Sequence, residues 1–83
     1  MIRSLDGKMP KVHPEAFVSE FAYVIGDVRI GKWSSIWPGV VIRADAGKIE
    51  IGENTNIQDN SVVHGHADVH IANNVDIGHR VIS

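Results

Sequence analysis

Residues 24–45, VIGDVRIGKWSSIWPGVVIRAD, carry a large aliphatic side chain at every sixth position. Along the whole chain, with two breaks, this series consists of Val18, Val24, Ile30, Ile36, Ile42, Ile51, Ile57, Val63, Ile71 and Ile77. Small or β-branched residues stand mostly four positions after each aliphatic, at Ala22, Val28, Ser34, Val40, Ala46, Thr55, Ser61, Ala67, Val75 and Val81. After the second break, Val69, Val75 and Val81 form a competing register for the aliphatic series.

A period of six favours one particular fold. In an α-helix the pattern of buried side chains repeats about every 3.6 residues. In a plain strand it repeats about every two residues, with no additional signal at every sixth position. A short strand followed by a bend explains the hexad, and three such sides close a triangular coil of roughly eighteen residues. Glycine, which often follows the aliphatic, permits the backbone angles that bends require. We therefore predict an all-β chain that forms a parallel β-helix of about three to four coils, in preference to a small antiparallel sandwich.

The hexads also predict how the chain is organised. Residues 1–83 are expected to form a single domain, with a lead-in over 1–17 and hexapeptide coils over 18–83. The two breaks, 46–50 and 65–70, are expected to be loops that leave the coil at its corners. Insertions of this kind are where solenoids carry functional residues.

Composition excludes several classes of function. Eight basic and ten acidic side chains give a net charge of −2, without like-charged runs, so nucleic acid is not an expected partner. The absence of cysteine excludes disulfides and thiolate metal sites. No segment has the apolar length of a membrane span or signal peptide, and we predict a cytoplasmic protein.

The segments VIGDVRIGKWSSIWPGVVIRAD, IGENTNIQDNSVVHG and VDIGHRVIS together resemble the γ-class carbonic anhydrase family, from GKMPKVHPEAFV near the start to Ser83. The resemblance implies a left-handed β-helix that assembles as a homotrimer. It also implies one zinc ion per subunit interface, or iron or cobalt, held by three histidines. The implied reaction is the reversible hydration of carbon dioxide to bicarbonate by a zinc-bound hydroxide.

The resemblance assigns two metal ligands to residues of this chain. His64, at the end of SVVH, matches the first ligand, and His79, in IGH, matches the ligand supplied across the interface. The third ligand falls one position beyond Ser83, so we expect a C-terminally truncated chain that holds metal weakly. His66 or His70 is an alternative third ligand, and the simpler interpretation is that all of them are exposed strand histidines.

The resemblance also assigns roles to the polar residues and one tryptophan near these histidines. Asn56 and Gln58 match positions that line the pocket and bind the metal-bound water or substrate. The remaining matches are expected at the subunit interface, where they make polar contacts or pack, and are Arg43, Asp45, Asp59 and Trp37.

Two acidic positions of the family are absent, and this weakens the expectation of fast turnover. Ala46 stands where a proton-relay glutamate is expected, and Asp68 is the only acid in the loop after His64. His66 or His70 is a hypothetical substitute, because imidazole titrates near neutrality. The alternatives are a non-catalytic assembly module and, less favoured, a hexapeptide-repeat acyltransferase. A truncated coil would expose the surroundings of Ile71, Ile77 and Val81, so end-to-end association is also expected.

Overall fold

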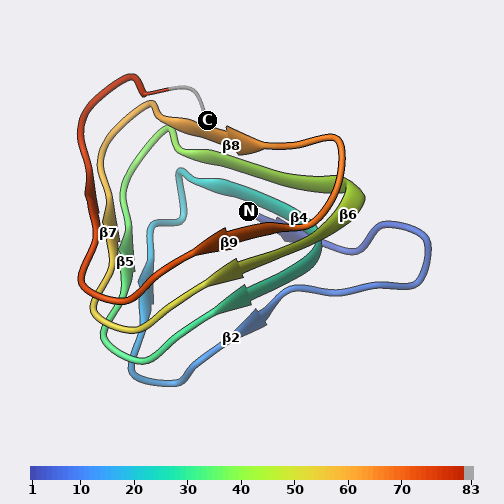
Figure 1. Cartoon of the computed structure of the whole chain (residues 1–83), viewed down its shortest axis with the longest axis horizontal. Coiled ribbons are helices and arrows are strands. Elements are labelled where there is room, and N and C mark those ends of the chain that lie inside the picture. Colours follow the sequence, from blue (N-terminus) through green and yellow to red (C-terminus); the bar gives the residue numbers. More distant parts are fainter. Residues whose placement is uncertain (82–83) are drawn as a thin grey trace.

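The computed structural model describes residues 1–81, in which short parallel strands wind into a triangular tube (Figure 1). One side of the triangle, called face 1, consists of β3 (Phe17–Val18), β5 (Ser35–Ile36), β7 (Asn56–Ile57) and β10 (Asp76–Ile77). Face 2 consists of β1 (Ile2–Arg3), the first halves of β4 (Tyr23–Ile30) and β6 (Val41–Ile51), and β8 (Val62–His64). Face 3 consists of β2 (Lys11–Val12), the second halves of β4 and β6, and β9 (Val69–Ile71).

The strand register measures each turn of the tube. Phe17 pairs with Ser35 eighteen residues later, and Ser35 pairs with Asn56 twenty-one residues later. Asn56 in turn pairs with Asp76 after twenty residues. The predicted parallel β-helix is therefore confirmed. The first turn has the length expected from three hexads, and the next two are longer because of the extra residues at the two breaks. No helix capable of crossing a membrane occurs within residues 1–81.

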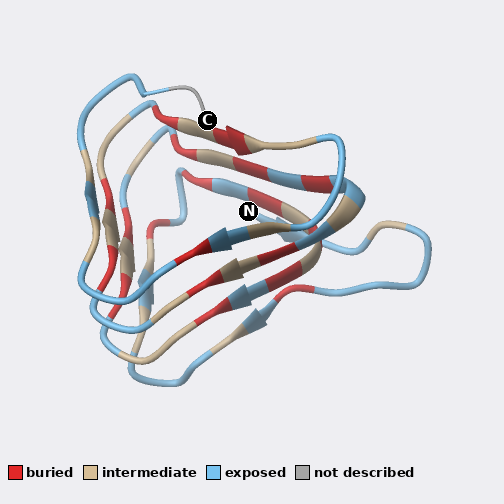
Figure 2. Cartoon of the chain, viewed as in Figure 1, coloured by how far each residue is buried: buried red, intermediate tan, exposed pale blue. Residues whose placement is uncertain are grey.

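The hexad aliphatics form the core, as predicted (Figure 2). Eight of the ten are buried, at Val24, Ile30, Ile36, Ile42, Ile51, Ile57, Val63 and Ile71, while Val18 and Ile77 are partly buried. Each fully buried aliphatic contributes about 1.5–3 kcal/mol relative to an exposed one. Because no turn can bury this surface alone, stacking of successive turns is what stabilises the fold.

The small or β-branched series also faces the interior in the uninterrupted turns, but not at the two breaks. Its buried members are Ala22, Val28, Ser34, Val40, Thr55 and Ser61. Ala46 and Ala67 are exposed, and Ile49 and Val69 take the inward positions instead. Val69 also does not compete with Ile71, because residues two apart on a strand point to the same side. The second inward residue of each hexad thus lies two positions before the main aliphatic.

The first predicted loop, 46–50, is wrong as a separate element. These residues continue β6, which runs for 11 residues around the corner between faces 2 and 3. Gly26 pairs with Ala44 but Val28 pairs with Ile49, so the three extra residues of β6 form a bulge against β4. The second predicted loop is shorter than expected, because His70 already belongs to β9.

Asparagine, more often than glycine, makes the bends at two corners. Left-handed backbone angles occur at Trp33, Asn54 and Asn74 at one corner, and at Gly39, Asn60 and Arg80 at another. Asparagine tolerates this conformation because its side chain can bond locally. The Asn54 side chain also donates to Asn74 Oδ1 at 2.8 Å, which joins two successive turns.

Candidate functional site

The first predicted ligand, His64, is held by a carboxylate of the neighbouring turn. His64 ends β8 and pairs with Arg43 of β6, which places Asp45 one step further along the same edge. The distance between His64 Nε2 and Asp45 Oδ1 is 2.8 Å. An ionised carboxylate only accepts, so Nε2–H is the donor. Arg43 Nε lies 3.7 Å from the other oxygen of Asp45, and all three side chains are partly exposed.

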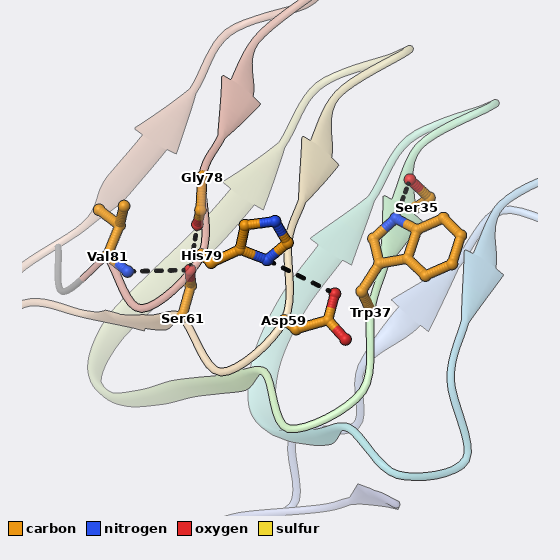
Figure 3. A network of polar contacts seen from close by, with 7 residues as sticks. All are labelled: Ser35, Trp37, Asp59, Ser61, Gly78, His79 and Val81. Carbon is orange, nitrogen blue, oxygen red and sulfur yellow. Dashed lines mark hydrogen bonds and ion pairs between the residues drawn. The ribbon is translucent and has the colours of Figure 1, made fainter.

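The second predicted ligand, His79, lies beside a carboxylate of its own chain. Its Nδ1 is 3.8 Å from Asp59 Oδ1, and its side chain is 71% exposed (Figure 3). The backbone N–H of Arg80 donates to the Asp59 carbonyl at 3.1 Å, which ties the two turns together at this corner. Most of the His79 ring is therefore available to a partner outside the chain.

One chain does not assemble the predicted metal site by itself. His64 ends β8, which follows face 2, whereas His79 lies two residues after β10 on face 1. Among residues 1–81, no group of three or more His, Cys, Asp or Glu side chains is placed to hold a metal ion. These two histidines could therefore act together in a site shared between subunits, which is the arrangement predicted above.

The two histidines predicted as substitutes lie in different places. The His66 ring centroid is 6.1 Å from that of His64, with the rings inclined by 67°, so His66 is close to the first ligand. His70 lies on face 3, where it pairs with Glu50, and its side chain is exposed. The structure thus brings His66, and not His70, to the predicted site.

Asn56 belongs to a hydrogen-bonded row on the outside of face 1. The Trp37 indole N–H donates to Ser35 Oγ at 2.9 Å, and Ser35 Oγ donates to Asn56 Oδ1 at 2.6 Å. Asn56 Nδ2 then donates to Asp76 Oδ1 at 2.8 Å. Ser35 and Asp76 were not predicted from the sequence, although the turn register places both directly beside Asn56.

Gln58 and Trp37 occupy the corner that follows face 1. Gln58 is partly buried, and its backbone N–H donates to the Ile77 carbonyl at 2.9 Å. Trp37 is exposed, as a residue at an interface between subunits would be in a single chain, and its ring centroid is 5.3 Å from that of Phe17 (Figure 3 shows Trp37). An exposed aromatic pair of this kind is typical of protein interfaces.

A cavity of about 460 Å³ opens beside Asp45, at the corner between faces 2 and 3. Asp68, the acid of the second break, lines it together with Lys48, whose backbone N–H donates to Asp68 Oδ1 at 3.0 Å. The exposed side chain of Ala46 stands next to this cavity in sequence. Asp68 therefore binds the backbone of the β6 bulge. It also lines the same cavity as Asp45, whose carboxylate holds His64.

Comparison with known proteins agrees with the hexads. The family described as bacterial transferase hexapeptide (six repeats) matches residues 9–44. A hexapeptide transferase family protein from Anaplasma phagocytophilum superposes with a TM-score of 0.94 at 51% identity, over 98% of this chain and 48% of that one. The chain therefore shares the hexapeptide repeat and the β-helix fold of these proteins.

Two relatives of this hexapeptide-repeat protein are carbonic anhydrases. Gamma carbonic anhydrase 1 of Arabidopsis thaliana, a mitochondrial protein, is 49% identical over 83 residues, covering 90% of this chain and 30% of the relative. A carbonic anhydrase of Geobacillus kaustophilus is 40% identical over 84 residues, covering 99% of this chain and 46% of the relative. The resemblance found from the motifs is confirmed, and the chain spans less than half the length of these relatives.

Proposed function

We propose that this hexapeptide-repeat protein supplies the ligands of a γ-carbonic-anhydrase-type metal centre. His64 of one subunit and His79 of another would hold the metal in a homotrimer, with carbon dioxide and bicarbonate as the reactant pair. The observation that carries the proposal is the 2.8 Å contact between His64 Nε2 and Asp45 Oδ1. Two relatives named as carbonic anhydrases support it.

The chemistry of the available donors fits zinc. Imidazole nitrogens are common zinc ligands, and iron and cobalt accept them as well. Ligating histidines usually bond a carboxylate through the other ring nitrogen, and here both candidate histidines lie beside one. The donors fit as a set shared between chains, since residues 1–81 of one chain hold no cluster of three.

Each residue near the centre has a role that its contacts support. Asp45 restrains the His64 ring through one carboxylate oxygen, and Arg43 forms an ion pair with the other. Asp59 lies against the His79 ring. When bound, the metal lowers the pKa of a water molecule and polarises the substrate. Asn56 and Gln58 would orient the substrate, Asn56 with its amide fixed by Ser35 and Asp76.

Removal of protons is the step for which this chain is least equipped. Ala46 carries no acid at the bulge, and Asp68 already accepts a hydrogen bond from the Lys48 backbone. His66, close to His64, is the proposed proton carrier, because its side chain is exposed and an imidazole ring can both accept and donate a proton. We therefore expect slow turnover that responds to buffer concentration, and a His66→Gln variant that depends on buffer more strongly.

A test by subunit mixing separates a shared site from one within a single chain. His64→Ala and His79→Ala chains would each lose metal and carbon dioxide hydration. Co-refolded mixtures of the two variants would recover part of both, because some interfaces would contain both intact histidines. No recovery, with assembly intact by light scattering, would contradict the shared site. The measurement should be made on this chain and on a version extended by further coils, with metal content determined alongside.

A transferase is the second candidate, because the matching repeat family and the superposed protein from Anaplasma phagocytophilum are both described as transferases. Acyl transfer by a hexapeptide-repeat enzyme would use a histidine base and coenzyme A bound between subunits. Saturable binding of acetyl-coenzyme A that His79→Ala abolishes, without metal dependence, would favour this candidate. A folded assembly that shows neither activity would favour a structural module.

A further inference from the structure

A second cavity, of about 450 Å³, lies between the lead-in and face 3, and no histidine is among its lining residues. It is lined by Gly7, Lys8, Met9, Pro10, Lys11, Asp27 and Arg29. Its three cations and one carboxylate give a net formal charge of +2, although the whole chain carries −2. Its volume lies in the range of small-molecule sites, about 300–1,000 Å³. The cavity therefore has a positively charged lining in a protein of net negative charge, and it is large enough for a small ligand.

Strand register places two of the cations side by side. Lys11 of β2 pairs directly with Arg29 of β4, and both side chains are exposed. Like charges directly opposite each other on neighbouring strands destabilise a sheet. Within residues 1–81, no carboxylate oxygen lies within 4.0 Å of either side chain's nitrogens, since the ion pairs involve other residues. Glu50 of β6 pairs with Arg29 on the other side of β4, but its carboxylate forms its ion pair with Lys48, at 3.3 Å. The repulsion between Lys11 and Arg29 is therefore not relieved by an ion pair within residues 1–81.

The third cation is held in place by a tight turn. Leu5 and Lys8 exchange two backbone hydrogen bonds of 2.8 and 2.9 Å, with Asp6 and Gly7 between them at φ angles of 50° and 77°. Two consecutive positive φ angles in a two-residue hairpin define a type I′ turn, for which Asp-Gly is a preferred sequence. This hairpin projects from the triangle between β1 and β2 (Figure 1) and presents Lys8 at the cavity.

We propose that this cavity binds a phosphate group, with Arg29, Lys11 and Lys8 as its ligands. The planar guanidinium of Arg29 can hold two phosphate oxygens at once, and the ammonium groups supply compact charge. A bound dianion would also remove the repulsion between Lys11 and Arg29. The net charge of +2 in the lining matches the charge of one phosphate dianion, so a single phosphate, free or at the end of a small ester, is the class that fits.

The test is a titration of the 83-residue protein with inorganic phosphate and, separately, with adenosine monophosphate, followed by NMR. Saturable shifts at residues 8, 11 and 29 are expected, weakening as sodium chloride is raised. Arg29→Gln and Lys11→Gln should each weaken binding about tenfold. Arg3→Gln is the matched control, because Arg3 is an exposed strand residue that pairs with β4 outside the cavity.

The outcomes separate a phosphate site from general ionic attraction. Unchanged affinity in Arg3→Gln supports the proposal, while an equal loss in that variant overturns it. Absence of saturable binding for both ligands, or an identical response to sodium chloride alone, also overturns it. Tighter binding of adenosine monophosphate identifies a phosphate ester as the ligand class, and equal binding identifies free phosphate. Metal content should not change in either variant, so the result does not depend on the proposed metal centre.

Discussion

Asp45 accepts a hydrogen bond from His64 Nε2 at 2.8 Å, although 19 residues separate them in sequence. The parallel register between β6 and β8 explains the contact, because Arg43 pairs with His64 and Asp45 follows on the same edge. The bulge of β6 begins at this point, so the chain departs from regular pairing where it carries the polar group. Bulges commonly redirect side chains next to functional sites in this way.

Replacing Asp45 with Asn should weaken metal binding without unfolding the protein. The amide is a poorer acceptor for His64, and losing an orienting carboxylate typically costs about 10–100-fold in metal affinity. The measurement is a cobalt or zinc titration of the assembled protein, with circular dichroism to verify the fold. Asp68→Asn is the matched control, because Asp68 lines the same cavity but accepts from the Lys48 backbone. An equal loss of affinity in both variants would show that Asp45 acts only through the charge of the cavity.

Replacing Gly26 with Ala should destabilise the corner that carries Asp45. Gly26 has a φ of +90°, and a Cβ there would lie 2.7 Å from the carbonyl oxygen of Ala44. Strain and collision together are expected to lower the free energy of unfolding by about 2 kcal/mol or more, measured by urea denaturation. Gly7→Ala is the control, since Gly7 has a φ of +77° and a Cβ there would meet no other atom within 4 Å. A Gly26 effect no larger than that of Gly7 would mean that the bulge relaxes around the methyl group.

Buried hydroxyls join successive turns inside the tube. Ser34, Thr55 and Ser61 each donate to a carbonyl of the next turn, at 2.6, 2.7 and 2.6 Å. Each also accepts a backbone N–H from that turn, at 3.0, 3.3 and 3.1 Å. All three residues are essentially inaccessible to solvent, so their hydroxyls find in the backbone of the next turn the hydrogen-bond partners that water cannot supply.

Thr55→Val should therefore destabilise the protein despite preserving shape. It leaves the Ala72 carbonyl and the Val75 N–H without the side-chain partner they have now, at a cost of about 1–3 kcal/mol. Thr55→Ser, which keeps the hydroxyl and loses a methyl group, should cost less. Equilibrium unfolding in urea measures both. If Thr55→Ser lowers the free energy of unfolding more than Thr55→Val does, packing of the methyl group outweighs the hydrogen bonds.

Much of this fold could be predicted from sequence, because the six-residue repeat indicates both the length of each strand and which of its side chains point into the tube. Ile36, Ile42 and Ile57 are inaccessible to solvent for that reason. The prediction failed at 46–50, where a loop was expected and β6 continues instead. Extra residues shift the phase there, and only the strand pairing shows which side chain turns inward. Sequence alone also did not separate the roles of Ser34 and Ala22, because a hydroxyl matters only once a carbonyl of the next turn faces it.

The candidate site was less predictable than the fold. The resemblance selected His64 and Asp45 as separate ligand and interface residues, and the hydrogen bond between them appears only once the turns are aligned. Ser35 and Asp76 were missed because neither has a distinctive motif, although both flank Asn56 in the register. The roles of His79 and Gln58 stay predictions, since they depend on a second chain.

The 83-residue chain should self-associate through the end of the tube formed by β8, β9 and β10. Within residues 1–81 each of these strands pairs on one side only, and Val75 and Ile77 there are only partly buried. Open strand edges with apolar neighbours favour pairing with another copy, and a charge pointing inward at such an edge opposes it. Ile77→Lys should therefore reduce the particle mass measured by light scattering. Ile2→Lys, the same change at the edge strand β1 of the opposite end, should leave the mass unchanged. A wild-type protein that remains monomeric at working concentration would contradict both this association and the proposed trimer.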